Sequence, residues 1–219
     1  MLLINRIYYI SFALLLCYGS NSAFSQQKWT PSANEDGIQV FTRPGVNLKM
    51  KAVKVSSIFN ATPTQVVAAI LDIKTCNEWV YHSKINTLIR QLSPVDLIYY
   101  SRVEVPWPVE DRDYVVAIHT EQNPQTKVIT ITSPCVPGYV PEKKGIVRIS
   151  HSVGQWTITP MGKNQTRAEY MLEVDPGGNI PAWLINLFAT KGPTETFRNL
   201  KTHVQKDVYK KARLDAIAD

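Results

Sequence analysis

The most chemically suggestive stretch of the sequence is a run of charged residues in which Glu110, Asp111 and Asp113 flank Arg112. Closely spaced carboxylates can act as a general acid and base, or can hold a metal ion. The same pattern also occurs at a charged turn that enters a strand, where neighbouring carboxylates hold the arginine by ion pairs. We favour the second interpretation over a catalytic or metal-binding cluster.

Other catalytic constellations are absent from the sequence. It contains no G-x-S-x-G nucleophile elbow, no G-x-x-x-x-G-K-[ST] phosphate loop, no H-E-x-x-H pair and no C-x-x-C pair. The four histidines stand singly, without the spacing of a metal-ligand pair: His82, His119, His151 and His203. We therefore expect neither a resident metal nor a cofactor.

Composition points to one folded domain without a nucleic-acid partner. The chain has 219 residues, 24 Lys and Arg against 18 Asp and Glu, a formal net charge of +6, and 44% hydrophobic residues. Such a chain is too apolar and too sparsely charged to be disordered, and its length suits one domain or two small ones. The positive surplus forms no compact run beyond Lys143-Lys144 and Lys210-Lys211, so nucleic-acid binding is not expected.

The first 25 residues have the layout of a secretory signal peptide. Arg6 precedes a mostly apolar, uncharged run at residues 7–17, and small residues follow up to a cleavage site before Gln26. The run is shorter than the ~20 residues that a membrane-spanning helix needs, although an uncleaved anchor is an alternative. We expect a mature domain over residues 26–219 that is exported, to the periplasm if the protein is bacterial and otherwise by secretion.

Export would leave two cysteines, Cys76 and Cys135, in an oxidising compartment where disulfides form. A disulfide requires the two Cα atoms to lie within about 7 Å of each other. The sequence alone leaves two alternatives open, a disulfide between them or two buried free thiols.

The hydrophobic pattern predicts an α+β fold. Alternating apolar residues separated by turn residues predict antiparallel strands at 38–43, 48–58, 84–91, 97–105, 113–121, 127–132, 146–151, 155–159 and 167–174. Thr62, Pro63 and Gln65 have the pattern of a helix N-terminus with a capping box. A long amphipathic helix should begin near Pro181, and Gly192-Pro193 should break or kink it. A curved sheet wrapped around this helix must bury its apolar face, and any space held open between them would be an apolar cavity.

Three segments, in this order, carry a recognisable pattern. They are Val-Pro-Trp-Pro-Val-Glu-Asp-Arg-Asp-Tyr-Val at 105–115, Gly-Ile-Val-Arg at 145–148 with Trp-Thr-Ile-Thr-Pro at 156–160, and Asp-Pro-Gly-Gly-Asn-Ile-Pro-Ala-Trp-Leu-Ile-Asn at 175–186. Together with Asp36-Gly37-Ile38, Leu71-Asp72 and Trp79 ahead of them, the set resembles the START domain, the steroidogenic-acute-regulatory-related lipid-transfer family. The resemblance covers residues 29–211.

The resemblance implies a helix-grip fold, in which a U-shaped antiparallel sheet surrounds a long C-terminal helix and one lipid or sterol-like molecule occupies the tunnel between them. The loop at residues 106–111 and the helix starting at Pro181 would form the lid. Arg112 and Asp113 match the family's Arg-Asp pair, and we expect them to be structural, locking the loop to the sheet. Trp107 lies between two prolines and could contact a membrane surface transiently or pack beneath the lid.

Strand parity selects the residues that should face the cavity, because alternate side chains of a strand point to one face. The expected lining residues are Tyr99, Ser101, Val103, Tyr114, Val116, Ile118, Tyr170 and Leu172 from strands, with Trp183, Leu187 and Phe188 from the C-terminal helix. The alternative is that many of these side chains fill a solid core.

One departure from the family concerns sterols. Some sterol-carrying members bury a Glu and an Arg on the fifth and sixth strands, and the matching positions here hold Tyr99 and Ile118. A tyrosine hydroxyl needs only one hydrogen bond, whereas a buried charge needs a partner. We therefore expect a mostly apolar cavity with Tyr and Ser contacts, which weakens the case for a sterol without selecting another lipid.

These observations favour a monomeric, non-enzymatic protein that binds one lipid or sterol-like molecule and carries it between membranes. One alternative is a cyclase-, aromatase- or hydrolase-like enzyme on the same fold. Such an enzyme would need His119 or Glu104 beside Tyr99, and strand parity places both on the opposite face from Tyr99. The other alternative is a lipid-responsive sensor that binds its ligand without transferring it.

Overall fold

The computed structural model describes residues 28–45, 51–178 and 180–219, and over these residues the chain forms one sheet of ten strands. The predicted signal peptide at 1–25 lies outside the described residues. The strands are β1 (Thr30–Glu35), β2 (Ile38–Pro44), β3 (Lys51–Phe59), β4 (Ser83–Gln91), β5 (Leu97–Val103), β6 (Asp111–Gln122), β7 (Ile129–Pro134), β8 (Ile146–Arg148), β9 (Ser152–Pro160) and β10 (Thr166–Val174). Their order is β1-β2-β3-β10-β9-β7-β6-β5-β4, all antiparallel, and the short β8 pairs in parallel with β6.

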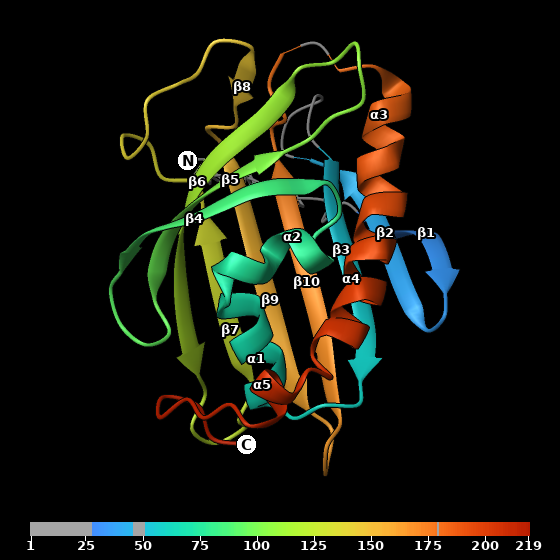
Figure 1. The fold of residues 1–219 in the computed structure, drawn as a ribbon. Coiled ribbons are helices and arrows are strands. Elements are labelled where there is room, and N and C mark those ends of the chain that lie inside the picture. The colour runs from blue at the N-terminus through green and yellow to red at the C-terminus, as the bar shows by residue number, and fades with distance from the viewer. Residues whose placement is uncertain (1–27, 46–50, 179) are drawn as a thin grey trace, which may run out of the picture.

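The helices lie inside the curve of this sheet. They are α1 (Pro63–Leu71), η1 (Ile73–Thr75), α2 (Cys76–Trp79), α3 (Ala182–Asn186), η2 (Leu187–Lys191), α4 (Gly192–His203) and α5 (Asp207–Lys210). Figure 1 shows the long helix made of α3, η2 and α4 running along one side of the sheet, with α1 and α2 beside it. Helix α4 packs against β2 and β3, and α1 packs against β9. The predicted α+β helix-grip architecture is confirmed.

Helix α1 begins where its sequence signals predict. The Thr62 hydroxyl accepts the Gln65 amide hydrogen at 3.3 Å, and the Gln65 side-chain oxygen accepts the Thr62 amide hydrogen at 3.0 Å. This reciprocal capping box satisfies amide donors that the first helical turn leaves free. Pro63 occupies a position where no donor is needed. The buried side chains of Val66 and Ile70 then attach the helix to the core.

The C-terminal helix differs from its prediction in part. The sequence predicts a break or kink at Gly192-Pro193. The break is wrong, because the chain remains helical from α3 through α4, but the helix is irregular directly before Gly192. Pro193 has no amide hydrogen to donate, and the turn before it, η2, is wound as a π-helix in which the Gly192 amide donates to the Leu187 carbonyl. This wider turn accommodates the proline without ending the helix.

The solid core lies between the sheet, α1, α2 and the second half of α4. Phe59 and Phe197 meet edge to face with ring centroids 5.9 Å apart, and Trp156 stacks on Phe197 at 5.4 Å. Full burial of such a side chain contributes about 1.5–3 kcal/mol. These contacts fix α4 against β3 and β9, so one part of the long helix is firmly held.

The structure answers the open question about the cysteines with two free thiols. Cys76 is buried in α2, on the helical side of the fold, whereas Cys135 follows β7 and its sulfur lies 2.9 Å from the Ser152 hydroxyl oxygen. The two residues therefore belong to different layers, and the disulfide alternative is wrong. Burial raises the pKa of the Cys76 thiol to about 12, which keeps it protonated and unreactive.

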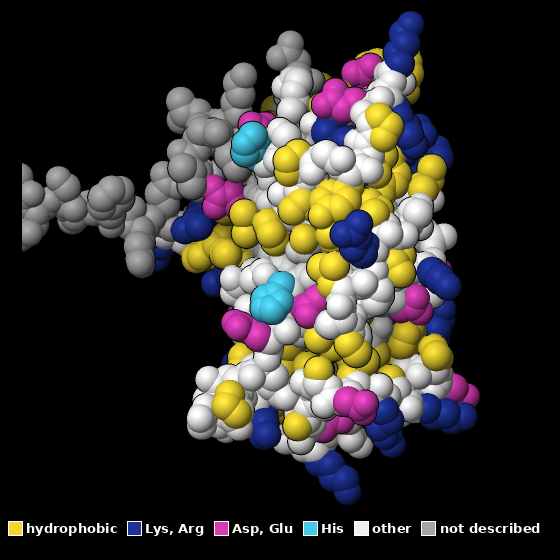
Figure 2. Space-filling view, turned by 90° about the vertical axis from the view of Figure 1, so that its left-hand side faces the viewer, with side chains coloured by type: hydrophobic (Ala, Val, Ile, Leu, Met, Phe, Trp, Pro, Cys, Tyr) yellow, Lys and Arg dark blue, Asp and Glu magenta, His cyan; other side chains and the backbone are white. Residues whose placement is uncertain are grey.

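Edge strand β4 leaves Ile85 and Leu88 exposed, and Leu92 is exposed just beyond it. Figure 2 shows the side of the molecule that carries this edge, with hydrophobic side chains gathered in a band between scattered basic and acidic groups.

Within the described residues, no helix has the length and apolar character needed to cross a membrane.

Candidate functional site

An apolar cavity of about 300 Å³ lies between the inner face of the sheet and the C-terminal helix. Strands β3, β5, β6 and β10 supply most of one wall, and α3, η2 and the start of α4 supply the other. Most of the predicted lining residues line it: Tyr99, Val103, Tyr114, Val116, Tyr170 and Leu172 from strands, and Phe188 from the C-terminal helix. Their contact with a ligand remains a prediction, but the structure brings them together around one space.

Two predicted strand residues share this inner face without lining the cavity. Ser101 is buried, and its hydroxyl donates to the Asn86 side-chain oxygen at 2.9 Å. Ile118 pairs with Leu97 across β5 and β6, and both belong to the solid core. Parity identifies the face correctly, but it cannot tell where along the strand the cavity ends and the core begins.

Two predicted helix residues are also displaced from the cavity. Trp183 is 49% exposed, and neither Trp183 nor Leu187 contributes to the lining. The helical residues that line the space include Leu184, Ile185 and Ala189, together with the correctly predicted Phe188. The residues that line the cavity lie one position further along the helix than the predicted set, so the face that meets the cavity is rotated from the one chosen.

Tyrosine hydroxyls provide much of the polarity inside the cavity. The rings of Tyr99 and Tyr114 meet edge to face with centroids 6.3 Å apart, and Tyr170 packs on Trp156 at 4.6 Å. Burial raises the pKa of Tyr99, Tyr114 and Tyr170 above the ordinary value for a phenol. The hydroxyls are therefore neutral and can donate or accept hydrogen bonds without acting as bases at physiological pH.

Further polar lining residues were not selected from the sequence. They are Ser133, Ser152, Thr196 and Arg112. The serines and the threonine lack a signal that separates them from surface residues. Arg112 did have a sequence signal. The alternation that places Tyr114 and Val116 on the inner face of β6 places Arg112 there as well.

The carboxylates around Arg112 have other partners, so the prediction that they hold this arginine is wrong. Asp111 accepts hydrogen bonds from the Arg102 guanidinium at 2.8 Å and from the Val105 amide at 3.0 Å. Asp113 is 1% exposed and accepts bonds from Arg148 at 2.6 and 3.0 Å, which join β6 to β8. Because β6 alternates, these carboxylates lie on the outer face and Arg112 on the inner one.

Arg112 instead joins two loops at one end of the cavity. Its guanidinium donates to the Glu110 carbonyl in the β5–β6 loop, and to the Pro176 and Gly177 carbonyls at 3.4 Å each in the loop before α3. The first loop belongs to the predicted lid segment at 106–111, and the second leads into the helix that was predicted to complete the lid. Trp107 stands at the tip of the first loop with 91% of its surface exposed, so the alternative in which it packs beneath the lid is wrong.

The residues considered for an enzyme lie outside the cavity. Glu104 is exposed and pairs with Lys84 at 2.7 Å, and His119 is exposed and bonds to Asp96 at 2.9 Å. Among the described residues, the cavity lining contains no carboxylate, imidazole or thiol. Nor do the described residues include a group of three or more His, Cys, Asp or Glu side chains placed to hold a metal ion.

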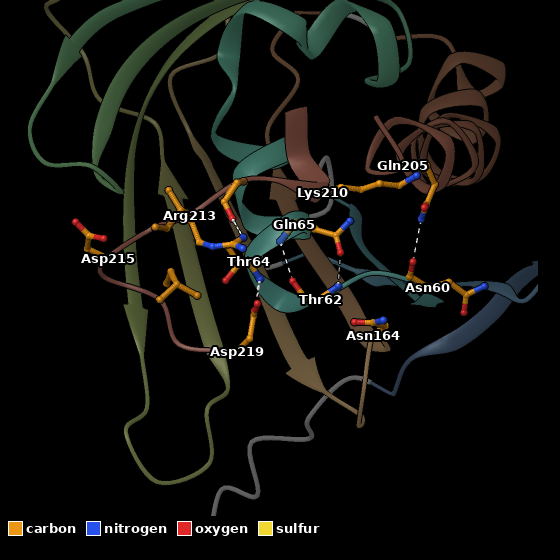
Figure 3. A pocket seen from close by; sticks show the side chains of 13 residues that line it. Asn60, Thr62, Thr64, Gln65, Asn164, Gln205, Lys210, Arg213, Asp215 and Asp219 are labelled. Atoms are coloured by element: carbon orange, nitrogen blue, oxygen red, sulfur yellow. Dashed lines mark hydrogen bonds between the residues drawn. The ribbon is translucent and has the colours of Figure 1, made fainter. Parts of the chain in front are cut away.

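A second, polar hollow lies at the other end of the molecule, between the N-terminus of α1 and the chain after α5, with a volume of about 720 Å³. Figure 3 shows its side chains linked to nearby backbone: Asp219 accepts from the Thr64 amide at 2.8 Å, and Gln205 donates to the Asn60 carbonyl at 2.9 Å. These contacts attach the C-terminal segment to α1. The side chains of the polar hollow therefore hold the C-terminal segment in place beside α1.

Comparison with known proteins agrees with this architecture. The START domain family model matches residues 20–210. An uncharacterised protein of Pseudomonas aeruginosa is 32% identical over 82% of this chain and 88% of its own length, and the phosphatidylcholine transfer protein of Bos taurus is 25% identical over 86% and 89%. The crystal structure of a STAR-related lipid transfer protein from Xanthomonas axonopodis has a TM-score of 0.74 and 28% identity, covering 81% of this chain and 99% of that one. The chain belongs to the START domain family.

Proposed function

We propose that this protein binds a single lipid in the apolar cavity and carries it between membranes without chemical conversion. The observation that carries the proposal is the lining itself, in which apolar side chains and neutral tyrosines predominate and whose described residues include no carboxylate, imidazole or thiol. Such a lining favours uptake of a hydrophobic molecule through burial of its surface. The START family membership and the lipid-transfer names of its relatives support the same conclusion.

Burial of one acyl chain would supply much of the favourable free energy of binding. At about 0.8 kcal/mol per methylene, about ten buried methylenes contribute about 8 kcal/mol, which is of the size needed to offset the roughly 4–15 kcal/mol that association costs in lost translational and rotational freedom. The cavity volume of about 300 Å³ lies at the small end of known ligand pockets. A two-chain lipid would therefore require the lid segments to move outward as it enters.

A phospholipid is our first candidate ligand, because several of the relatives are phosphatidylcholine transfer proteins. A sterol is less well supported. The two positions that carry a buried charge pair in some sterol carriers are Tyr99, which faces the cavity, and Ile118, which packs in the solid core.

Exchange would take place at a membrane surface, with Trp107 entering the interface. An indole suits the boundary between headgroups and acyl chains, and the exposed tip of the β5–β6 loop presents it there. We further propose that the protein acts as a monomer after export, in the periplasm of a bacterial source and otherwise outside the cell.

A transfer assay between donor and acceptor vesicles tests this function. Fluorescent phosphatidylcholine in the donor vesicles should reach the acceptor vesicles at a rate proportional to protein concentration, and its chemical structure should be unchanged. Binding without exchange would favour the sensor alternative, and a converted product would favour the enzyme. Failure to bind phospholipid, fatty acid and sterol would overturn the proposal. Light scattering measures the mass in solution and so tests whether the protein is a monomer.

A further inference from the structure

Arg112 is the only charged residue among the described residues that line the cavity. It is the first inward-facing residue of β6 and pairs across the sheet with Val103. Only 5% of its surface is exposed. A guanidinium in such surroundings has lost most of its hydration, which is costly unless other groups replace the lost hydrogen bonds and balance the charge.

The protein replaces part of the hydration but does not balance the charge. The two carboxylates adjacent to it in sequence, Asp111 and Asp113, are paired with Arg102 and Arg148 on the other face of the strand. Among the described residues, no carboxylate lies within ion-pair distance of Arg112. Desolvation lowers the pKa of Arg112, although the more distant charges of Glu110 and Asp111 oppose the shift.

The hydrogen bonds of Arg112 also leave donors free. A guanidinium has five N–H groups in a fixed fork, and three carbonyl oxygens accept from it, two of them at 3.4 Å. Two N–H groups are therefore available. A fork of this kind matches the two oxygens of a carboxylate or phosphate.

The loop before α3 brings backbone carbonyls to Arg112. Gly177 and Gly178 both have positive φ angles, 65° and 62°, a conformation that glycine adopts without strain. The Asp175 side chain accepts the Gly177 amide hydrogen at 3.0 Å and fixes the turn. Pro176 of the same loop lines the cavity beside Arg112. In the described part of the chain, the loop gives Arg112 carbonyl partners, while its Asp175 carboxylate bonds to the Gly177 amide and forms no ion pair with Arg112.

We propose that Arg112 binds the oxyanion of the carried lipid, a phosphodiester or a carboxylate, and so selects an anionic-group-bearing lipid over a neutral one. This inference rests on the proposed lipid-binding function and adds a ligand class to it. The polarity of the cavity fits such a ligand. Along β6 the inward side chains run from Arg112 through Tyr114 to Val116, so a headgroup at Arg112 would direct its chain toward the apolar part of the space.

Matched lipids that differ in the oxyanion test the proposal. We would measure equilibrium binding of oleate against methyl oleate, and of phosphatidylcholine against diacylglycerol with the same acyl chains. The wild-type protein should bind the oxyanion member of at least one pair about tenfold more tightly or better, as charge-assisted hydrogen bonds predict. A preference confined to oleate over methyl oleate identifies a fatty-acid carboxylate as the ligand group. A preference confined to phosphatidylcholine over diacylglycerol identifies a phosphodiester. Either result, or both together, supports the shared oxyanion chemistry.

Substitution of Arg112 distinguishes binding of the lipid oxyanion from the contacts that Arg112 makes with the loops. Arg112→Gln should abolish the preference, so that the oxyanion and neutral members of each lipid pair bind with equal affinity. Arg102→Gln is the matched control, because it removes the side-chain partner of Asp111 on the outer face at the start of β6, and it should keep the preference. If Arg112→Gln does not fold, Arg112→Lys and the wild-type lipid pairs still decide the question, with the lysine expected to weaken the preference.

Equal binding of the oxyanion and neutral members of both pairs by the wild-type protein would overturn the proposal while leaving lipid binding intact. An undiminished preference in Arg112→Gln would also overturn it. Absence of binding to all four lipids would instead contradict the proposed function itself.

Discussion

Charged residues on the two faces of strand β6 have different kinds of partner. On the outer face, Asp111 and Asp113 each bond to an arginine, and Tyr100 adds a hydrogen bond to Asp113 at 3.1 Å. On the inner face, Arg112 lies between apolar side chains and has only carbonyl partners among the described residues. Adjacent residues of one strand therefore belong to two different environments.

The charges on the outer face are paired within the protein, whereas the charge on the inner face is not. A buried charge with a geometrically matched partner holds elements together and leaves nothing to offer a ligand. The inner face, by contrast, combines unfilled space with an unbalanced charge. The comparison predicts that damage to the outer face is seen mainly in stability, and damage to the inner face mainly in binding.

The largest expected effect follows from breaking the outer face at Arg148. Arg148→Met leaves the Asp113 carboxylate buried without its cationic partner, which should lower the free energy of unfolding by about 3–5 kcal/mol. Denaturant unfolding measures this change. Arg102→Gln, at a more exposed pair, should cost at most about 1 kcal/mol. Equal losses in the two variants would remove the distinction between the buried and exposed pairs.

Filling the cavity should produce the next largest effect. Leu172→Trp places a larger side chain in the lining, so lipid affinity should fall by about 100-fold, equivalent to about 2.7 kcal/mol. Overpacking should cost about 1–3 kcal/mol of stability. Met171→Trp is the matched control, because the neighbouring side chain points to the opposite face of β10. Full lipid affinity in Leu172→Trp would show that the ligand binds elsewhere.

Much of this organisation can be predicted from the sequence, because strand alternation is a strong local signal. The period of two assigns Tyr99, Tyr114 and Tyr170 to the inner face, and the capping pattern at Thr62 locates α1. The same alternation would have assigned Arg112 to the cavity. The motif in which it stands drew attention to its neighbouring carboxylates instead, although their side chains point the other way.

The features that the sequence does not predict depend on three-dimensional context. Strand β1 has the sequence Thr-Pro-Ser-Ala-Asn-Glu, which has little strand character, and it forms because β2 offers an edge to pair with. The π-helical turn depends on how the helix accommodates Pro193 while packed on the sheet. The boundary between cavity and solid core depends on packing, which separates Val116 from Ile118 on the same face of one strand.

A smaller effect is expected at the tip of the lid. Trp107→Ala should slow vesicle-to-vesicle transfer by about tenfold, because burying a large apolar side chain at a membrane is worth about 1.5–3 kcal/mol when complete. Equilibrium affinity for the lipid should not change. Leu92→Ala removes an exposed apolar side chain away from the lid and should leave transfer unaffected. Equal slowing in both variants would argue against a specific role for Trp107.

The smallest expected effect is a pH dependence at Asp111. Burial opposes ionisation of this group, but hydrogen bonds from the Val105 amide and Arg102 outweigh it, so its pKa lies below the ordinary value of 3.8. The group therefore contributes stability that is present above pH 3.8 and is lost as the pH falls through the lower folded-state pKa. Acid unfolding of Asp111→Asn should lack this part of the pH dependence. An unchanged acid profile in the variant would contradict the assignment.

The central claim, one lipid held in the cavity of the inner face, is tested most directly by native mass spectrometry of the protein after exposure to phospholipid vesicles. We expect a complex of one lipid per chain for the wild-type protein and for Met171→Trp, and mostly lipid-free protein for Leu172→Trp. Lipid-free wild-type protein, or equal lipid occupancy in Leu172→Trp, would contradict the claim.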